Sequence, residues 1–331
     1  MSYVYTVARL RGMENRFLDA SFFLRLIDSV TLDDALKALG ETVYSRWLGG
    51  LDTDFDRIID EELWHVFDEL RQFVPDRELL DLYRMPHDFN NVKVVLKSLL
   101  RVRDGGERRY DLLSRLGSVN TEEIVAAIET EEYGLLPWGL NDVIPRCHAV
   151  WEQTKNVRNV EVLLDGQLFA SMHAVAEKLG MPSVVEWVKH RVDAENIRNA
   201  VRLSRLGLDG GASLPFFHGG GTIRPDNVAK LLGEAPESWG KTLSYSDIGA
   251  TLDALQDRTD VQTALSELSK ALDEYLIRVL EKAKYTMDAP ENVILYLLRK
   301  DMEARNLRIA LVCVANGLNR EFVRRLLSHV R

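Results

Sequence analysis

One six-residue pattern in the chain brings an acid, an amide and a base close together. It reads acid-x-x-Asn-aliphatic-base, and on a helix the acid and the Asn, three residues apart, share one face. Acid and base groups that converge on a substrate pocket would carry out acid–base catalysis. The same groups would otherwise form a buried hydrogen-bond clip between helices, because buried polar groups need partners. The pattern occurs three times, as Asp88, Asn91 and Lys93; Asp193, Asn196 and Arg198; and Glu303, Asn306 and Arg308.

The three copies are almost evenly spaced. Asn91 and Asn196 lie 105 residues apart, and Asn196 and Asn306 lie 110 residues apart. Near-equal spacing is the signature of an internal repeat. We therefore predict three related segments, at residues 1–104, 105–207 and 208–331. The triplication favours the clip over catalysis, because a protein seldom needs an active site three times at equal intervals.

The residues around each copy predict a helix. After Asn91 and Asn306, apolar residues recur at i, i+3, i+4, i+7 and i+8, which is one face of an α-helix. The middle copy begins in the same way and then breaks at Ser204 and Arg205. Two further features recur: a glycine that ends each helix, and an acid 31–33 residues before each Asn. They are Gly105, Gly207 and Gly317, and Asp60, Asp165 and Asp273.

The remaining periodicity is helical as well, so we predict an all-α fold. Residues 77–83 form a short helix that ends before Pro86, and the first repeat helix then begins near Asp88. Residues 143–164 and 167–178 form two further helices. Residues 320–331 form a basic amphipathic helix, which packs on its own segment or docks on an acidic partner. No strand pattern of useful length occurs.

Charge and cysteine content narrow the class of protein. The 331 residues carry 42 basic and 51 acidic side chains, a net charge of −9, which disfavours nucleic acid and anionic lipid as partners. The two cysteines, Cys147 and Cys313, imply no disulfide framework and fit a reducing cytoplasm. The N-terminus lacks the basic start and apolar run of a signal peptide, and no apolar stretch is long enough to span a membrane.

Motifs for known site chemistry are missing from the sequence. Gly240-Lys241-Thr242 resembles the end of a phosphate-binding loop, but the first glycine that this loop requires is replaced by Ala235. No two of the seven histidines lie at i, i+4, the spacing of a local zinc site on a helix. We therefore expect no catalytic residue, no metal ligand and no cofactor.

The chain resembles a known family, the C subunits of archaeal and bacterial V/A-type rotary ATPases. These subunits are relatives of the d subunit of the eukaryotic vacuolar ATPase. The resemblance covers essentially the whole chain and depends on the order and spacing of several short pieces. They are Tyr5-x-x-Ala8-Arg9-Leu10-Arg11, Glu41-Thr42-Val43-Tyr44, Val192-Asp193-Ala194-Glu195-Asn196-Ile197-Arg198, Phe216-Phe217 before Gly220-Gly221, and Glu303-Ala304-Arg305-Asn306-Leu307-Arg308.

The resemblance implies a fold and a role. Family members are funnels of three similar helical segments around a pseudo-threefold axis, and they catalyse nothing. They sit on the cytoplasmic face of the membrane proteolipid rotor ring, receive the central stalk, and couple its rotation to proton or sodium transport. The resemblance thus implies a peripheral protein of the complex without lipid insertion, monomeric when isolated. Two alternatives remain: an unrelated helical-repeat scaffold with a binding groove, and a soluble helical enzyme, for instance a magnesium-dependent one.

Overall fold

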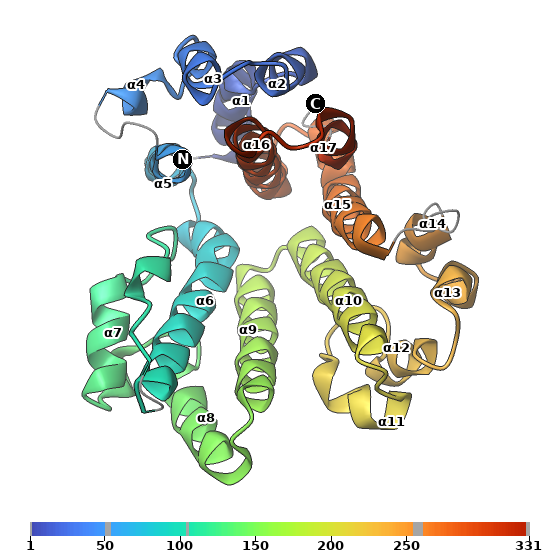
Figure 1. The fold of residues 1–331 in the computed structure, drawn as a ribbon. Helices are drawn as coiled ribbons and strands as arrows, with labels where there is room; N and C mark the ends of the chain where they lie inside the picture. Colours follow the sequence, from blue (N-terminus) through green and yellow to red (C-terminus); the bar gives the residue numbers. More distant parts are fainter. Residues whose placement is uncertain (1, 50–53, 104–105, 254–260, 329–331) are drawn as a thin grey trace. The chain divides into compact units, whose positions relative to one another are not determined.

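The predicted all-α class is confirmed. The computed structural model describes residues 2–49, 54–103, 106–253 and 261–328, and over these ranges the chain forms helices joined by turns and loops, with no strand (Figure 1). None of the described helices is long and apolar enough to cross a membrane. The predicted segment boundary at 104–105 and the last residues of the predicted C-terminal helix, 329–331, lie outside the described residues.

Spatial contacts divide the chain into two compact units. One unit combines residues 1–75 with residues 237–331, and the other is residues 76–236. Both ends of the chain therefore belong to the same unit. This division follows contacts in space and not sequence recurrence, so the division into three repeats stays a prediction.

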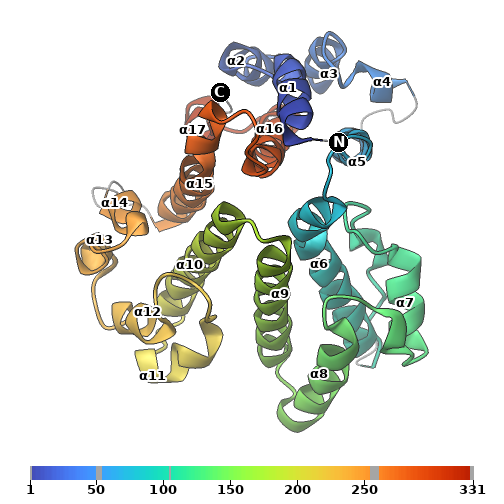
Figure 2. The ribbon, with the colours of Figure 1, turned by 180° about the vertical axis from the view of Figure 1, so that it is seen from behind.

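Three long helices form the unit of residues 76–236. α9 packs against both α6 and α10, and a shorter helix packs against each of the three (Figures 1 and 2). Tyr83 of α6 stacks on Trp187 of α10, with ring centroids 6.2 Å apart. The helices are α6 (Arg77–Arg103), α7 (Thr121–Glu129), α8 (Leu140–Thr154), α9 (Val157–Leu179), α10 (Pro182–Arg205), α11 (Gly210–Ser213) and α12 (Pro225–Leu231).

The other unit is built around its longest helix, α16 (Glu291–Asn316). Helices from both ends of the chain pack against it, and α2 and α5 make extensive contact (Figures 1 and 2). The C-terminal helix, predicted over residues 320–331, ends earlier, at Leu326, because Leu327 is extended, and it packs on its own unit through the buried Val323. The remaining helices are α1 (Tyr3–Met13), α2 (Ala20–Ile27), α3 (Leu32–Leu39), α4 (Ser45–Leu48), α5 (Phe55–Arg71), α13 (Trp239–Thr242), α14 (Asp247–Asp253), α15 (Val261–Leu280) and α17 (Arg320–Leu326).

Local signals in the sequence set several helix ends. The Thr31 hydroxyl accepts the Asp34 N–H at 3.2 Å, which caps the start of α3. At the C-terminal end of α16, Gly317 adopts φ +61°, and just after α10 Gly207 adopts φ +66°. Glycine adopts this left-handed conformation at low cost, so both glycines end their helices as the sequence indicates.

The predicted break at Pro86 is wrong, because α6 runs through it without interruption. Proline removes one backbone hydrogen bond and costs a helix interior about 3 kcal/mol. The large side chains on either side of Pro86 are buried, and their burial outweighs that local cost. They are Leu82, Tyr83, Met85 and Phe89.

The predicted break between residues 164 and 167 is also wrong, since α9 continues through Gly166. The chain breaks earlier, where Lys155 adopts φ +49° and the Asn156 side chain accepts the Arg158 N–H at 3.0 Å. Asparagine is a strong N-cap, whereas a glycine inside a helix costs only about 1 kcal/mol. The cap therefore decides the boundary.

Two neighbouring positions on α16 test the packing. Leu311 is fully buried and Val312 is 37% exposed. We expect Leu311→Ala to lower the free energy of unfolding by about 2–5 kcal/mol through the cavity it leaves. Val312→Ala should change it by less than about 0.5 kcal/mol, because surface substitutions rarely do more. Urea denaturation followed by circular dichroism measures both, and equal losses would contradict the arrangement of α16.

Candidate functional site

The side-chain amide of each repeated Asn forms two hydrogen bonds with the backbone of one residue that lies 22 or 23 positions further along the chain, and we call this contact a grip. The amide oxygen accepts that residue's N–H, and the amide nitrogen donates to the same residue's carbonyl oxygen, at 2.8–3.0 Å in all three copies. The pairs are Asn91 with Ser114, Asn196 with His218, and Asn306 with Ser328. All three Asn residues are at most 1% exposed. The backbone groups that pair here are buried or half-buried, and the amide supplies the donor and the acceptor that a neighbouring strand would otherwise offer.

In the first two copies the acid grips the same loop a few residues further on. Each carboxylate accepts a hydroxyl and the N–H of the residue just before the N-cap of a short helix. Asp88 accepts the Ser118 hydroxyl at 2.6 Å and the Val119 N–H at 3.0 Å, and Asp193 accepts the Thr222 hydroxyl together with the Thr222 and Ile223 N–H groups at 3.0 Å. Acid and amide together therefore fix the loop and the start of α7 or α12. Each pair joins a helix to a loop, whereas the sequence analysis expected a clip between helices.

A glycine makes this close approach possible. Gly117 and Gly221 each lie two residues before the N–H that the acid accepts, and a Cβ atom at either position would overlap the carboxylate of Asp88 or Asp193. In the third copy the matching position is Arg16, and the acid is the longer Glu303. Arg84, four residues before Asp88, adds to the first loop by donating to the carbonyl oxygens of Leu116, at 2.8 Å, and Gly117.

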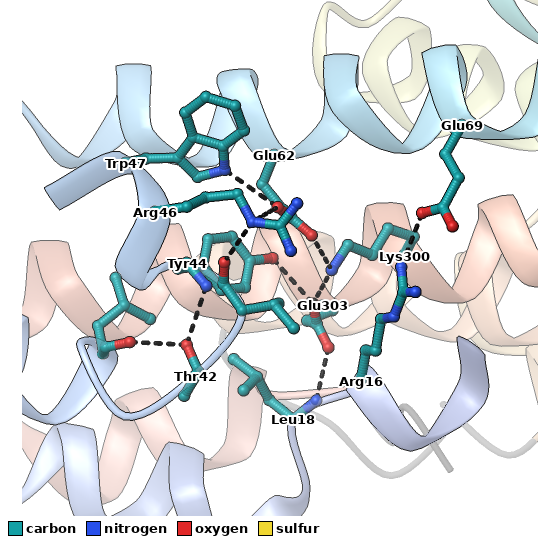
Figure 3. Close-up of polar contacts among 12 residues, drawn as sticks. Arg16, Leu18, Thr42, Tyr44, Arg46, Trp47, Glu62, Glu69, Lys300 and Glu303 are labelled. Atoms are coloured by element: carbon teal, nitrogen blue, oxygen red, sulfur yellow. Dashed lines mark hydrogen bonds and ion pairs between the residues drawn. The ribbon is translucent and has the colours of Figure 1, made fainter. Parts of the chain in front are cut away.

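The third acid accepts the equivalent N–H from the opposite end of the chain. Glu303 accepts the Leu18 N–H at 2.6 Å, and Leu18 directly precedes Asp19, the N-cap of α2. Glu303 also accepts the Tyr44 hydroxyl at 2.8 Å and pairs with Lys300 at 2.6 Å (Figure 3). Its carboxylate therefore joins the N-terminal segment, the residues before α4, and α16.

The third copy is the centre of a buried charged network (Figure 3). Lys300 and Glu303 are at most 1% exposed and Glu62 is 3% exposed. Lys300 lies 3.4 Å from Glu62, which accepts the indole N–H of Trp47 at 3.0 Å. Two carboxylates share one ammonium group here, Arg46 lies 4.0 Å from Glu62, and each carboxylate also accepts neutral donors, so every buried charge has partners.

The bases of the pattern lie outside the three grips. Lys93 pairs with Asp165 of α9, and Arg308 pairs with Asp60 and, at 3.1 Å, with Asp56 of α5. These pairs are partly exposed, and such pairs contribute at most about 1 kcal/mol each. Arg198 pairs within its own helix, with Glu195 at 3.3 Å, and Asp273 pairs with Arg305. In the first two copies the acid and the amide hold one loop system, whereas in the third they hold segments from opposite ends of the chain, and in all three copies the base pairs elsewhere.

Sequence reasoning missed four side chains that support the grips: Arg84, Lys300, Glu62 and Tyr44. One signal was available for two of them. Arg84 and Lys300 lie four and three residues before the acid of their copy, on the same helical face. No comparable local signal marks Glu62 and Tyr44, because both belong to a different part of the chain from Glu303.

The arrangement holds loops in place and offers little chemistry. Within the described ranges, no group of three or more His, Cys, Asp or Glu side chains is placed to hold a metal ion. The carboxylates of the pattern are already occupied by donors. Burial raises the pKa of the Cys147 thiol to about 12 and also raises that of Cys313, which disfavours the reactive thiolate.

Comparison with known proteins places the chain in a family. The sequence model of the ATP synthase (C/AC39) subunit family matches residues 6–326. The chain belongs to this family. It is 24% identical over 322 residues to the C subunit of the V-type sodium ATPase of Enterococcus hirae, and the match covers 97% of this chain and 96% of that protein.

Further relatives of this C/AC39-family chain come from both V-type and A-type enzymes. The C subunit of the V-type ATP synthase of Thermus thermophilus is 28% identical over 241 residues, 70% of this chain and 71% of that protein. The C subunit of the A-type ATP synthase of Desulfurococcus sp. is 24% identical over 348 residues, 99% of this chain and 91% of that protein. The predicted resemblance is thereby confirmed.

Burial changes the acidity of the first two acids. Burial raises the pKa of the Asp88 carboxyl to about 6, although the Ser118 hydroxyl, the Val119 N–H and the Arg84 charge act in the opposite direction. Burial likewise raises the pKa of Asp193, opposed by its donors on Thr222 and Ile223. Desolvation of the charged form therefore outweighs the hydrogen bonds at both positions.

The amide grip can be tested in the third copy, where α16 supplies a matched control. Asn306→Ala leaves the N–H and carbonyl oxygen of Ser328 without their amide partners in a buried site, so the free energy of unfolding should fall by about 2–4 kcal/mol. Asn316→Ala removes an exposed amide from the same helix and should cost less than about 0.5 kcal/mol. Chemical denaturation compares the two, and a cost for Asn306→Ala as small as the control's would refute the grip.

The raised pKa of Asp88 predicts a titration and a direction of stability. The folded state holds the proton more tightly than the unfolded chain does, so this carboxyl favours folding most below pH ~4, and the contribution is lost as the pH rises through about 6. Carboxyl-carbon NMR should show a midpoint near 6, assigned by its disappearance in Asp88→Asn. A midpoint near the ordinary aspartate value of about 3.9 would show that the site is hydrated.

Proposed function

We propose that this C/AC39-family chain is a non-catalytic adaptor in a V/A-type rotary ATPase. In this proposal it seats the rotating central stalk on the membrane proteolipid ring and transmits torque between them. The family match over residues 6–326 carries the proposal, because it spans all three copies of the repeated pattern. The names of the relatives, which are C subunits of V-type and A-type enzymes, support the same assignment.

The repeated grip supports a body of three related segments. The amide holds the segment that follows α6, α10 or α16, and the acid accepts the N–H just before the N-cap of a short helix, which in the third copy is α2 from the other end of the chain. In our proposal the segments at 1–104, 105–207 and 208–331 surround a pseudo-threefold axis and form a funnel for the stalk. A threefold wall would present similar surfaces around a rotating shaft.

The grips also suit a part that carries load. A torque-transmitting adaptor must deform little, and close-packed helices with few voids transmit strain well. Loops are ordinarily the most mobile parts of a helical protein. Here each loop after a long repeat helix is tied to that helix by buried side chains, Asn91, Asn196 and Asn306 among them. Stiff loops would limit the rotation lost between stalk and ring.

The proposal also covers partners and location. The chain would act at the cytoplasmic face of the cell membrane within the complex, bound to the stalk and the proteolipid ring, and would be monomeric when isolated. It would need no cofactor, since the nucleotide chemistry would take place on other parts of the complex. Coupled transport would move protons or sodium ions, with the choice made in the ring.

Removal and return of the chain test this function. From the source membranes, tagged chain should recover a small hydrophobic proteolipid together with a coiled-coil stalk protein. Vesicles with the complex lacking this chain should hydrolyse ATP without pumping ions, and purified chain should restore pumping. Recovery of neither partner, or ATP-driven pumping at the full rate without the chain, would refute the adaptor role. Heat-unfolded chain serves as the control for nonspecific restoration.

A further inference from the structure

The third grip is completed by a segment from the opposite end of the chain. In the first two copies the acid accepts an N–H that follows it by 31 or 30 residues, at Val119 and Ile223. Glu303 accepts instead the N–H of Leu18, 285 residues earlier in the chain. The neighbouring Asn306 keeps its own downstream partner, Ser328, 22 residues on.

The equivalence of these three sites extends beyond one hydrogen bond. Each of the residues Val119, Ile223 and Leu18 precedes the N-cap of a short helix, and that helix packs on the same long helix that supplies the acid. The pairs are α7 on α6, α12 on α10, and α2 on α16. Helix α2, near the start of the chain, therefore packs on α16 as α7 packs on α6 and α12 packs on α10.

A basic residue four positions before the acid reaches the same segment in two copies. Arg84 donates to the carbonyl oxygens of Leu116 and Gly117, just before Val119. Arg299 lies 3.7 Å from Glu14, four residues before Leu18. Arg299 thus also contacts the segment before the short helix, through an ion pair with a side chain and independently of the carboxylate of Glu303. It supports the correspondence between the N-terminal segment and the loop after α6.

We propose that residues 14–19 are a latch, which closes the third segment non-covalently and can open while the other two loops stay closed. The loops after α6 and α10 are covalent continuations of the helices that hold them. The latch is joined to α16 only through side chains and packing, so it can leave its seat without any change in those two loops. Its release would also free the apolar face of α2 from α16. This inference does not depend on the proposed function.

The side chains of α16 that hold the latch, which we call its seat, differ in charge from those that hold the other two loops. The acid is Glu303 in place of an Asp, and three residues before it stands Lys300, where the other copies have Met85 and His190. Closing a contact between residues 285 positions apart costs more chain entropy than closing one over 30. Glu303 also pairs with the ammonium of Lys300 at 2.6 Å, and a hydrogen bond between two charged groups is among the stronger kind.

Further contacts hold the latch on either side of Leu18. Arg16 pairs with Glu69 of α5 at 2.7 Å, and the ring of Phe17 lies 5.0 Å from that of Tyr296 on α16 (Figure 3 shows Arg16 and Glu69). The ammonium of Lys300 lies 6.0 Å from the centre of the Phe17 ring. Opening the latch therefore breaks a defined set of contacts, all of them within one unit of the fold.

Amide hydrogen exchange of the full-length protein tests the latch directly. In the wild type, the amides of Leu18 and of α2 should exchange through a local opening that depends weakly on urea, whereas Val119 and Ile223 should require larger openings. Glu303→Gln removes the charge but keeps the shape, and should speed exchange in residues 17–27 by about tenfold or more. Exchange at residues 119–128 and 223–231 should stay as in the wild type.

A second variant separates the latch from general core damage. Lys300→Met with Glu303→Asp gives the third site the residue types found at Met85 and Asp88. If these residues sufficed without a covalently continuous loop, protection at residues 17–27 would survive, and the proposal would be wrong. It would also be wrong if either variant accelerated exchange equally at all three short helices, or if wild-type Leu18 opened only with global unfolding. Val312→Ala, exposed on α16, is the control and should change none of these rates.

Discussion

A buried loop backbone has to find hydrogen-bond partners, and this constraint shapes the whole chain. Beyond each long helix α6, α10 and α16, the chain passes back along the helix, and N–H and carbonyl groups there lie in buried or half-buried surroundings. One Asn supplies a donor and an acceptor to a single loop residue, and one carboxylate closes on the N–H before the next short helix. Removing either partner would leave a buried polar group unsatisfied, so the acid and the amide are needed together. The recurrence of these two residue types at one spacing follows from that requirement.

The same grips connect the fold with membership in the ATP synthase (C/AC39) subunit family. The adaptor role proposed above would need stiffness in the loops as well as in the helices. The cost of that stiffness is visible at Asp88 and Asp193, where burial raises the pKa of each carboxyl. Both acids hold their loops although their charged forms are disfavoured there. Polar groups of this kind fix one arrangement of the loop more than they add to stability, in contrast to the apolar contacts of Leu311 and its neighbours.

The two units differ in how their repeats are completed. In the unit of residues 76–236, the loops after α6 and α10 continue the chain, and an Asp with neutral donors suffices. In the other unit, the segment before α2 arrives from the far end of the chain, and Lys300 and Glu303 with Glu62 and Tyr44 form a charged network under it. Ion pairs in a core are retained where geometry must be unique, and here they define where a separate segment docks. Two of the equivalent sites thus hold a loop that is covalently continuous with the long helix, and the third holds a separate segment with the help of a buried ion pair.

The pattern of residues by itself determined the helical class, the three copies of acid and Asn, the caps at Thr31 and Gly317, and the family. The helical class and the caps depend on periodicity within short stretches, which determines local backbone structure. The repeat and the family depend on the order and spacing of short motifs along the chain. Tertiary structure decided the rest. Packing of Leu82 and Phe89 carries α6 through Pro86, and the cap at Asn156 moves a helix boundary away from Gly166. The partners of Asn91, Asn196 and Glu303 lie 22 to 285 residues away, and Glu62 and Tyr44 join them only in space. Spacing along a helix shows which side chains share a face, but the backbone that meets that face is selected by the packing of the whole unit.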